Sequence, residues 1–200
     1  MPKVYSEKER EYIKQRLKEE AANCMALYGV RKTTVDEIVK RVNIPKGTFY
    51  LFYESKEILM FDALNTLHDS VEKELFESLE QAKDKIDVEF LTDLITKICL
   101  DTKNSSLVKI MESGDMELIM RKLPEEITAA HMNHDLDTLQ KIGEYISVAQ
   151  TKDLSTYTAS FRGVFALLLF QKEIGEEQFP KVIRMVVRGI VMQLFEEEKQ

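Results

Sequence analysis

The residues best suited to bind a metal or transfer a proton lie in the second half of the chain. His131 and His134 are three residues apart, with Asp135 beside His134, a spacing that places side chains on one face of a helix. No third ligand and no Cys-x-x-Cys pair accompany them, so we predict partly exposed histidines, no metal ion and no cofactor. Asp115 and Glu117 form an acid pair, but no nucleophile or phosphate-binding loop lies near them. We therefore predict no catalytic residues and no enzyme activity.

A second set of hydrogen-bonding side chains lies on two short predicted helices between residues 34 and 52. Thr34-Val-Asp-Glu37 is a capping box that starts the first helix. Asn43-Ile44-Pro45 predicts a tight turn, because Asn tolerates the left-handed conformation and Pro suits the first position of a helix. Such a unit has the geometry of a helix-turn-helix, whose second helix enters the major groove of DNA.

Longer predicted helices position this unit. A capping box, Ser6-Glu-Lys-Glu9, starts the first helix, and Gly29 is suited to a helix C-cap with positive φ. Ser55 is the expected N-cap of a long helix that follows the two short ones. We predict further helices at Val88–Lys103, Leu107–Met111, Met116–Leu123, Pro124–Ala149, Leu154–Ile174 and Gln178–Glu198. The expected fold is all-α, with a three-helix head that carries the helix-turn-helix (residues 1–53) and a C-terminal helical body (residues 54–200).

Charge is distributed unevenly along the 200 residues. The chain has a net charge of −7, but residues 1–53 hold 11 basic and 7 acidic side chains, and residues 54–200 hold 17 basic and 28 acidic ones. A basic head on an acidic body is consistent with a head that binds an anion.

No uncharged stretch approaches the roughly 20 apolar residues of a membrane span, and no signal peptide opens the chain. Two cysteines are too few for a disulfide framework, so we expect a soluble cytoplasmic protein.

Residues 29–59 contain a specific series of short motifs, namely Thr33-Thr34, Lys46-Gly47-Thr48-Phe49-Tyr50, the aromatic run to Tyr53, and Ser55-Lys56-Glu57. In this order they closely resemble the DNA-binding signature of the tetracycline-repressor (TetR) family of bacterial transcription regulators. The resemblance covers the first quarter to third of the chain; beyond it, only length and helix order agree.

Three positions depart from the family pattern. Asn43 stands where the family usually has glycine, and Val39 where it usually has a small residue. Asn43 can hold a positive φ, so the turn should survive. Pro45 replaces a common polar N-cap and has no N–H to offer a phosphate.

The resemblance and side-chain chemistry together imply roles in DNA binding. Thr34, Tyr50 and Lys56 are expected to contact phosphates. Lys46 is expected to reach a base edge or a phosphate, and Thr48 a base edge or a thymine methyl group. Phe49 and Tyr53 are expected in the core of the head. The predicted DNA-binding residues are Thr33, Thr34, Lys46, Gly47 (which permits close approach), Thr48, Tyr50, Leu51 and Lys56.

Methionines and aromatic residues of the body are candidates for an effector cavity. Met111, Met116, Met120 and Met132 lie close together in sequence, and Met serves equally well as core filler or as the wall of an adaptable pocket. Regulators of the TetR family carry an effector cavity among the central helices of the body, which favours the pocket. The predicted lining is Phe90, Leu94, Ile98, Met111, Met116, Met120, Tyr145, Phe161 and Phe165.

The last two predicted helices are apolar nearly all round, which indicates burial on several sides. A second copy of the chain would supply that burial in a four-helix interface, through Phe161, Leu168, Ile183, Val187, Ile190 and Leu194. We therefore predict a homodimeric repressor that a small, mostly apolar effector releases from a near-palindromic DNA operator. Two alternatives stay open: a regulator without a small-molecule effector, and a helical ligand-binding dimer that has lost DNA binding.

Overall fold

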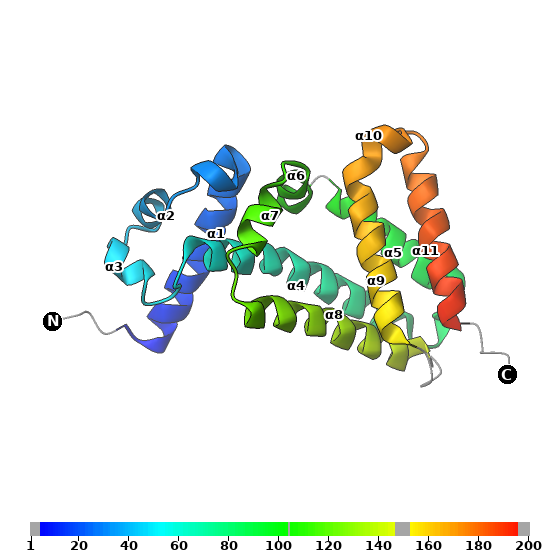
Figure 1. Cartoon of the computed structure of the whole chain (residues 1–200). Coiled ribbons are helices and arrows are strands. Elements are labelled where there is room, and N and C mark those ends of the chain that lie inside the picture. The colour runs from blue at the N-terminus through cyan, green and yellow to red at the C-terminus, as the bar shows by residue number, and fades with distance from the viewer. Residues whose placement is uncertain (1–4, 104, 147–152, 196–200) are drawn as a thin grey trace. The chain divides into compact units, whose positions relative to one another are not determined.

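The computed structural model describes residues 5–103, 105–146 and 153–195, and within these ranges every regular element is a helix (Figure 1). The all-α fold class is therefore confirmed. The predicted helix ends at Ala149 and Glu198 lie outside the described residues. The helices are α1 (Glu7–Lys32), α2 (Val35–Val42), α3 (Lys46–Phe49), α4 (Lys56–Ala82), α5 (Val88–Thr102), α6 (Ser106–Glu112), α7 (Asp115–Met120), α8 (Glu125–Ile146), α9 (Leu154–Leu167), α10 (Gln171–Ile174) and α11 (Phe179–Phe195), with short 3-10 turns at Lys83–Lys85 and Leu168–Phe170.

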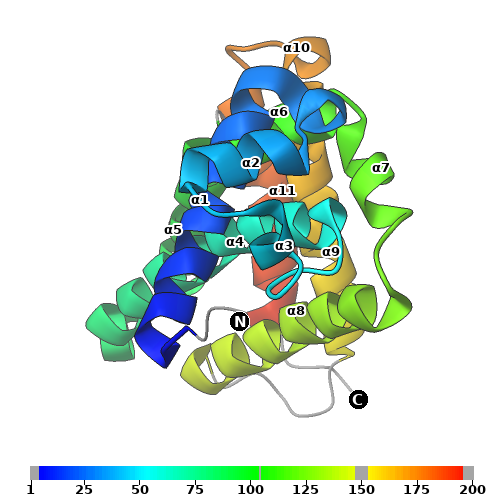
Figure 2. The same cartoon turned by 90° about the vertical axis from the view of Figure 1, so that its left-hand side faces the viewer.

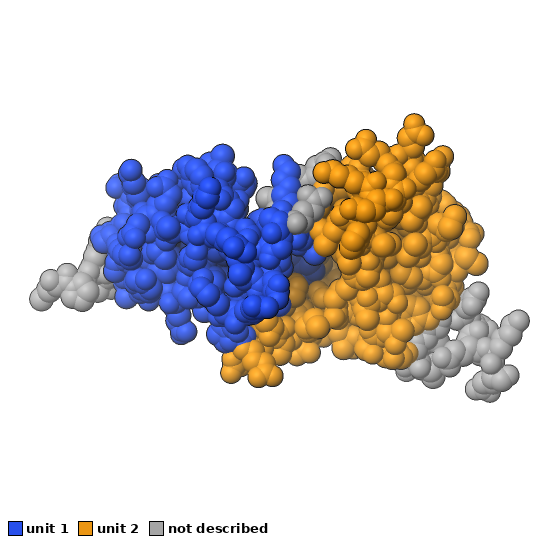
Figure 3. Space-filling model, turned by 45° about the horizontal axis from the view of Figure 1, so that its top comes forward, with its two compact units in different colours: residues 1–68, 109–124 blue, residues 69–108, 125–200 orange. Residues whose placement is uncertain are grey.

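The chain divides into two compact units (Figure 3). Unit 1 contains residues 1–68 and 109–124, and unit 2 contains residues 69–108 and 125–200. The predicted boundary at residue 53 differs from this division, which falls inside α4. It differs because local sequence signals end the head at the last DNA-binding motif, whereas unit 1 also takes in α7 from much later in the chain.

Helix α1 is the longest element of the N-terminal segment of unit 1. Its predicted capping box is present, since the Ser6 backbone N–H donates to Glu9 Oε2 (2.8 Å) and the Glu9 backbone N–H donates to Ser6 Oγ (3.4 Å). Gly29 has the expected positive φ of 75°, but it forms a kink, and helical hydrogen bonding continues to Lys32. Ile13, Leu17, Ala21 and Cys24 follow a helical spacing and are buried in the core of unit 1.

Helix α7 is joined to α1 by a buried carboxylate. Asp115 Oδ2 accepts a hydrogen bond from the backbone N–H of Val30 (3.1 Å), and Asp115 Oδ1 lies 3.4 Å from Arg31 Nε. The same Oδ2 would lie only 3.3 Å from a Cβ at Gly29, so the kink places bare backbone against the carboxylate. Asp115 is therefore a structural residue of unit 1.

The core of unit 2 forms around α11, which packs against α5 and α9 (Figure 1). Phe179, Ile183, Val187 and Val191 repeat at four-residue steps on α11 and are fully buried in this core. At the surface, Glu89 of α5 accepts hydrogen bonds from Arg184 (2.7 Å) and Arg188 (2.8 Å) of α11. Among the described residues, no helix combines the length and the apolar character needed to cross a bilayer.

Candidate nucleic-acid interface

Helix α2 starts at the N-cap that the sequence predicts. Thr34 has an extended backbone conformation, and its side-chain oxygen accepts a hydrogen bond from the backbone N–H of Glu37 (3.2 Å). The residue is exposed, so the positive end of the α2 dipole is open to an anion. At the other end of α2, Lys40 and Arg41 lie in the last turn, where their positive charges interact favourably with the negative end of the helix dipole.

The turn between α2 and α3 is made by Asn43. Its φ of 59° and ψ of 48° are left-handed helical, as expected for a residue that replaces the family's glycine. The backbone N–H of Ile44 then donates to the carbonyl oxygen of Val39 (3.0 Å), which closes the end of α2. Pro45 follows as the N-cap of α3 with φ of −63° and makes no side-chain capping bond. The departures at Asn43, Val39 and Pro45 thus leave the tight corner intact.

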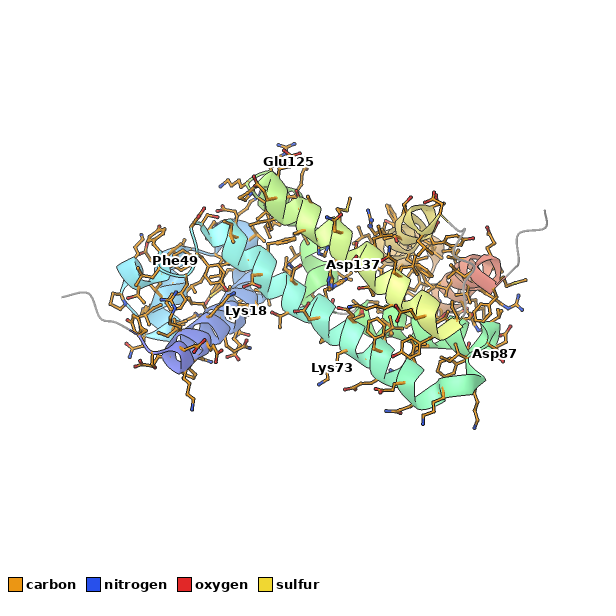
Figure 4. The ribbon with its side chains drawn as sticks, turned by 90° about the horizontal axis from the view of Figure 1, so that it is seen from below. Lys18, Phe49, Lys73, Asp87, Glu125 and Asp137 are labelled. Carbon is orange, nitrogen blue, oxygen red and sulfur yellow. The ribbon has the colours of Figure 1, made fainter. Side chains whose placement is uncertain are left out.

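Aromatic packing fixes α3 against the rest of unit 1. Phe49, labelled in Figure 4, is fully buried and contacts the Tyr50 ring edge-on, with centroids 5.1 Å apart. Ile38 and Val39 of α2 are buried in the same unit. Tyr53 is also buried, and its hydroxyl donates to Asp62 Oδ2 on α4 (2.6 Å). The prediction that Phe49 and Tyr53 belong to the core of the head is confirmed.

Four of the predicted DNA-binding residues are exposed on and directly after α3, which faces the viewer in Figure 2. Tyr50 is 53% exposed and Leu51 is 55% exposed, although both are large hydrophobic residues. A Cβ built on Gly47 would meet no atom within 4 Å, so open space lies beside this backbone. Lys46 is exposed at the first position of α3. These residues form one surface, the α3 surface, defined by Lys46, Gly47, Tyr50 and Leu51.

Three other predicted DNA-binding residues have side chains that contact polar groups within unit 1. Thr33 is fully buried, and its hydroxyl donates to the carbonyl oxygen of Gly29 (2.8 Å). Thr48 is buried, with its hydroxyl 3.4 Å from the hydroxyl of Tyr5. Lys56 Nζ donates to the carbonyl oxygens of Thr33 (2.8 Å) and Val30 (3.2 Å). These contacts hold the end of α1 and the base of α3 in place, and the DNA-binding roles of the three residues stay predictions.

Lys46 is paired with an acid. Its Nζ lies 2.9 Å from Asp36 Oδ2, and this hydrogen bond raises the pKa of the Lys46 ammonium. Both side chains are more than half exposed, so the pair is weak and exchanges readily for another anion. Lys46 is thus charged and available, with Asp36 as a competitor for any phosphate.

A capped short helix, a left-handed turn and a second helix with an exposed polar and aromatic surface define a helix-turn-helix DNA-binding unit. Residues 17–63 match the family model described as bacterial regulatory proteins, tetR family. The N-terminal segment of the chain therefore matches the tetR family, and the relatives that it resembles carry the description of transcriptional regulators.

Two relatives from Bacillus subtilis (strain 168) match the N-terminal part of the chain. The uncharacterised HTH-type transcriptional regulator YuxN is 41% identical over 51 residues, which are 26% of this chain and 18% of YuxN. The uncharacterised HTH-type transcriptional regulator YdgC is 36% identical over 66 residues, 33% of each chain. The match therefore spans a third or less of these two relatives.

The whole fold is similar to that of a TetR-family repressor. FadR of Thermus thermophilus, solved in complex with lauroyl-CoA, superposes with a TM-score of 0.62 at 18% identity. The superposition covers 94% of this chain and 97% of FadR. At that identity, the likeness concerns the fold alone, from the helix-turn-helix to the helical body.

The predicted effector-pocket residues are divided between the two units. Met111, Met116 and Met120 belong to unit 1, and the other six belong to unit 2. Within unit 2, Leu94 and Ile98 are buried in the core, while Phe90, Phe161 and Phe165 are partly buried against it. Tyr145 lines a groove of about 700 Å³ between α4 and α8, and its ring lies 6.2 Å from that of Phe76.

Most of the predicted dimer-interface residues are covered within one chain. Leu168, Ile183, Val187 and Leu194 are buried in unit 2, and Phe161 and Ile190 are partly buried there. The three α11 residues among the first four, Ile183, Val187 and Leu194, lie in the core of unit 2, where α11 packs against α5 and α9, and the predicted role of the set in a dimer stays a prediction. The apolar side chains that α11 does expose are Met185 (74%), Val186 and Met192.

Sequence reasoning missed one cluster, on α4 and α8. His134 was considered only with His131 on its own helix, whereas in the structure its Nε2 lies 2.9 Å from Glu72 Oε2 on α4. Thr138 donates to the other Glu72 oxygen (2.8 Å). No local spacing reveals this cluster, because its partners are more than 60 residues apart.

Proposed function

We propose that the chain is a homodimeric transcriptional repressor that binds operator DNA through α2 and α3. The observation that carries this proposal is the exposure of Tyr50 and Leu51 on the α3 surface, beside the open backbone of Gly47. These two side chains directly follow α3 and add apolar contact surface beside Lys46 and the open backbone of Gly47. A major groove accepts such a helix, with Lys46 at a base edge or a phosphate and the Tyr50 hydroxyl at a phosphate.

Binding of the full-length protein to DNA from upstream of its own gene tests this proposal. Fluorescence anisotropy across a salt series, with a random duplex alongside, separates specific from non-specific binding. Lys46→Ala should weaken binding and lower the salt slope by about one. Tyr50→Phe removes only the hydroxyl and should weaken binding as well. Lys73→Ala removes the same charge from unit 2, where Lys73 is exposed, and should have no effect.

Equal, weak binding to both duplexes, repeated on a pool of selected DNA sequences, would overturn the DNA-binding proposal. The chain would then be the helical ligand-binding dimer that has lost DNA binding. Asp36→Asn provides a further check, because removal of the competing carboxylate should tighten operator binding.

For the dimer, we propose a near-palindromic arrangement of two half-sites and an interface that includes the exposed face of α11. Met185, Val186 and Met192 are apolar and open to solvent on this face, and burial of such side chains favours association. Light scattering after size exclusion should give a dimer for the native chain and a monomer for Met185→Glu. A native monomer at micromolar concentration would contradict this arrangement.

For the effector, we propose a small, mostly apolar molecule bound in unit 2. The support is the fold likeness to FadR, which was solved with lauroyl-CoA, together with the partly buried aromatic residues Phe90, Phe161 and Phe165. A compound that binds unit 2 should release the protein from its operator if it prefers the conformation with misplaced DNA-binding helices. If no apolar compound alters operator affinity, the chain is a regulator without a small-molecule effector.

A further inference from the structure

Three side chains of unit 2 with metal-binding chemistry converge between α4 and α8, the helices labelled at Lys73 and Asp137 in Figure 4. Asp69, Glu72 and His134 each offer one ligand atom, and these atoms lie within 4.8 Å of one another. Two ligands bound to one ion at about 2.1 Å are separated by roughly 3–4 Å. The cluster is therefore close to the spacing of a coordination sphere before any side chain moves.

Glu72 is held in place on both of its oxygens. Oε1 accepts from the Thr138 hydroxyl (2.8 Å), and Oε2 lies 2.9 Å from His134 Nε2. The side chain is only 15% exposed. Partners of this kind orient a ligand before the metal arrives, and Thr138 keeps its contact when an ion replaces the direct contact between Glu72 and His134.

Solvent reaches the cluster through the groove between α4 and α8. Asp69 and Glu72 line this groove of about 700 Å³, together with Phe76 and Tyr145. Lys73 and Lys141 also line it and oppose a cation, so the affinity has to come from direct ligation.

We propose that Asp69, Glu72 and His134 bind a divalent transition-metal ion of the Zn²⁺ type. Mixed imidazole and carboxylate donors suit Zn²⁺, Ni²⁺, Co²⁺ and Fe²⁺, whereas Mg²⁺ and Ca²⁺ prefer oxygen ligands alone. This site departs from the sequence-based expectation that the chain binds no metal. The histidine pair His131 and His134 suggested ligands on one helix, but the carboxylates come from α4.

Titration calorimetry of the full-length protein with Zn²⁺, in the absence of DNA, tests the site independently of the proposed function. We expect one ion per chain and no heat of binding with Mg²⁺. His134→Ala and Glu72→Gln should each weaken binding by at least about tenfold. His131→Ala removes an imidazole one turn away on the same helix and should leave binding unchanged.

Asp69→Asn tests the site with a variant that should still fold, because Asp69 is exposed and its replacement leaves the core untouched. It should weaken Zn²⁺ binding while the melting curve of the metal-free protein stays unchanged. Co²⁺ should give a visible absorption spectrum with the native chain that disappears in His134→Ala. The proposal fails if the native chain binds Zn²⁺ no better than about 100 µM, or if His131→Ala weakens binding as much as His134→Ala.

Discussion

Replacement of Asp115 by alanine should destabilise unit 1 through a single backbone group. The Val30 N–H is buried and donates to Asp115 Oδ2 at 3.1 Å, so the variant leaves this donor without its partner. An unpaired buried N–H costs about 1–3 kcal/mol. The contact with Arg31 adds little, because the Arg31 side chain is 75% exposed and such pairs contribute about 0–1 kcal/mol. We expect a loss of about 2 kcal/mol, nearly all of it from the backbone hydrogen bond.

Urea unfolding followed by circular dichroism measures this loss, and amide hydrogen exchange locates it. Asp115→Asn retains an acceptor oxygen and should lose less than Asp115→Ala, while Arg31→Ala should lose less than about 0.5 kcal/mol. Glu117→Ala is the control, since Glu117 is an exposed acid on the same helix. The Val30 amide should exchange faster in Asp115→Ala. Equal losses for Arg31→Ala and Asp115→Ala, or unchanged exchange at Val30, would refute this account.

Three further outcomes follow from the structure. Asn43→Gly should fold normally, whereas Asn43→Val should lose about 1–2 kcal/mol in thermal unfolding because Asn43 is left-handed; equal stability of the two variants would contradict this. Cys24 and Cys99 are buried, and burial raises the pKa of the Cys99 thiol to about 11, so Ellman's reagent should titrate the thiols only in denaturant. Burial raises the pKa of Glu57, but the hydrogen bond from Lys122 (2.8 Å), a backbone hydrogen bond and the charges of Lys122 and Lys56 together outweigh it, and the folded pKa lies below the ordinary 4.5. The resulting stability is present above pH 4.5 and is lost as the pH falls through the folded pKa; Glu57→Gln should weaken this acid dependence of urea unfolding.

Local signals in the sequence predicted the helix starts and the tight turn. The capping residues Ser6 and Thr34 bond to groups three residues away, so their roles can be read from short motifs. Asn43 is similar, because a left-handed residue between two helices is a local requirement. These signals were sufficient for the helix-turn-helix and for the all-α fold.

The roles of other residues depended on partners that no local pattern reveals. The sequence predicted a phosphate contact for Lys56 but not its hydrogen bonds to the carbonyl groups of Val30 and Thr33 at the end of α1. The apolar pattern of α11 predicted burial on several sides, yet could not show that α5 and α9 supply most of it. Glu72 and His134 lie 62 residues apart and meet only because α4 and α8 pack together.

The discontinuity of unit 1 has a consequence for its synthesis on the ribosome. Residues 1–68 emerge first, but Asp115 and Lys122, which bond to Val30 and Glu57, are translated only after residues 69–108. During synthesis, the Val30 N–H of the DNA-binding unit therefore acquires its partner only after α7 has been translated. A protein fragment that stops at residue 68 would resemble this unfinished state, with the N-terminal helices present but without the segment that completes them.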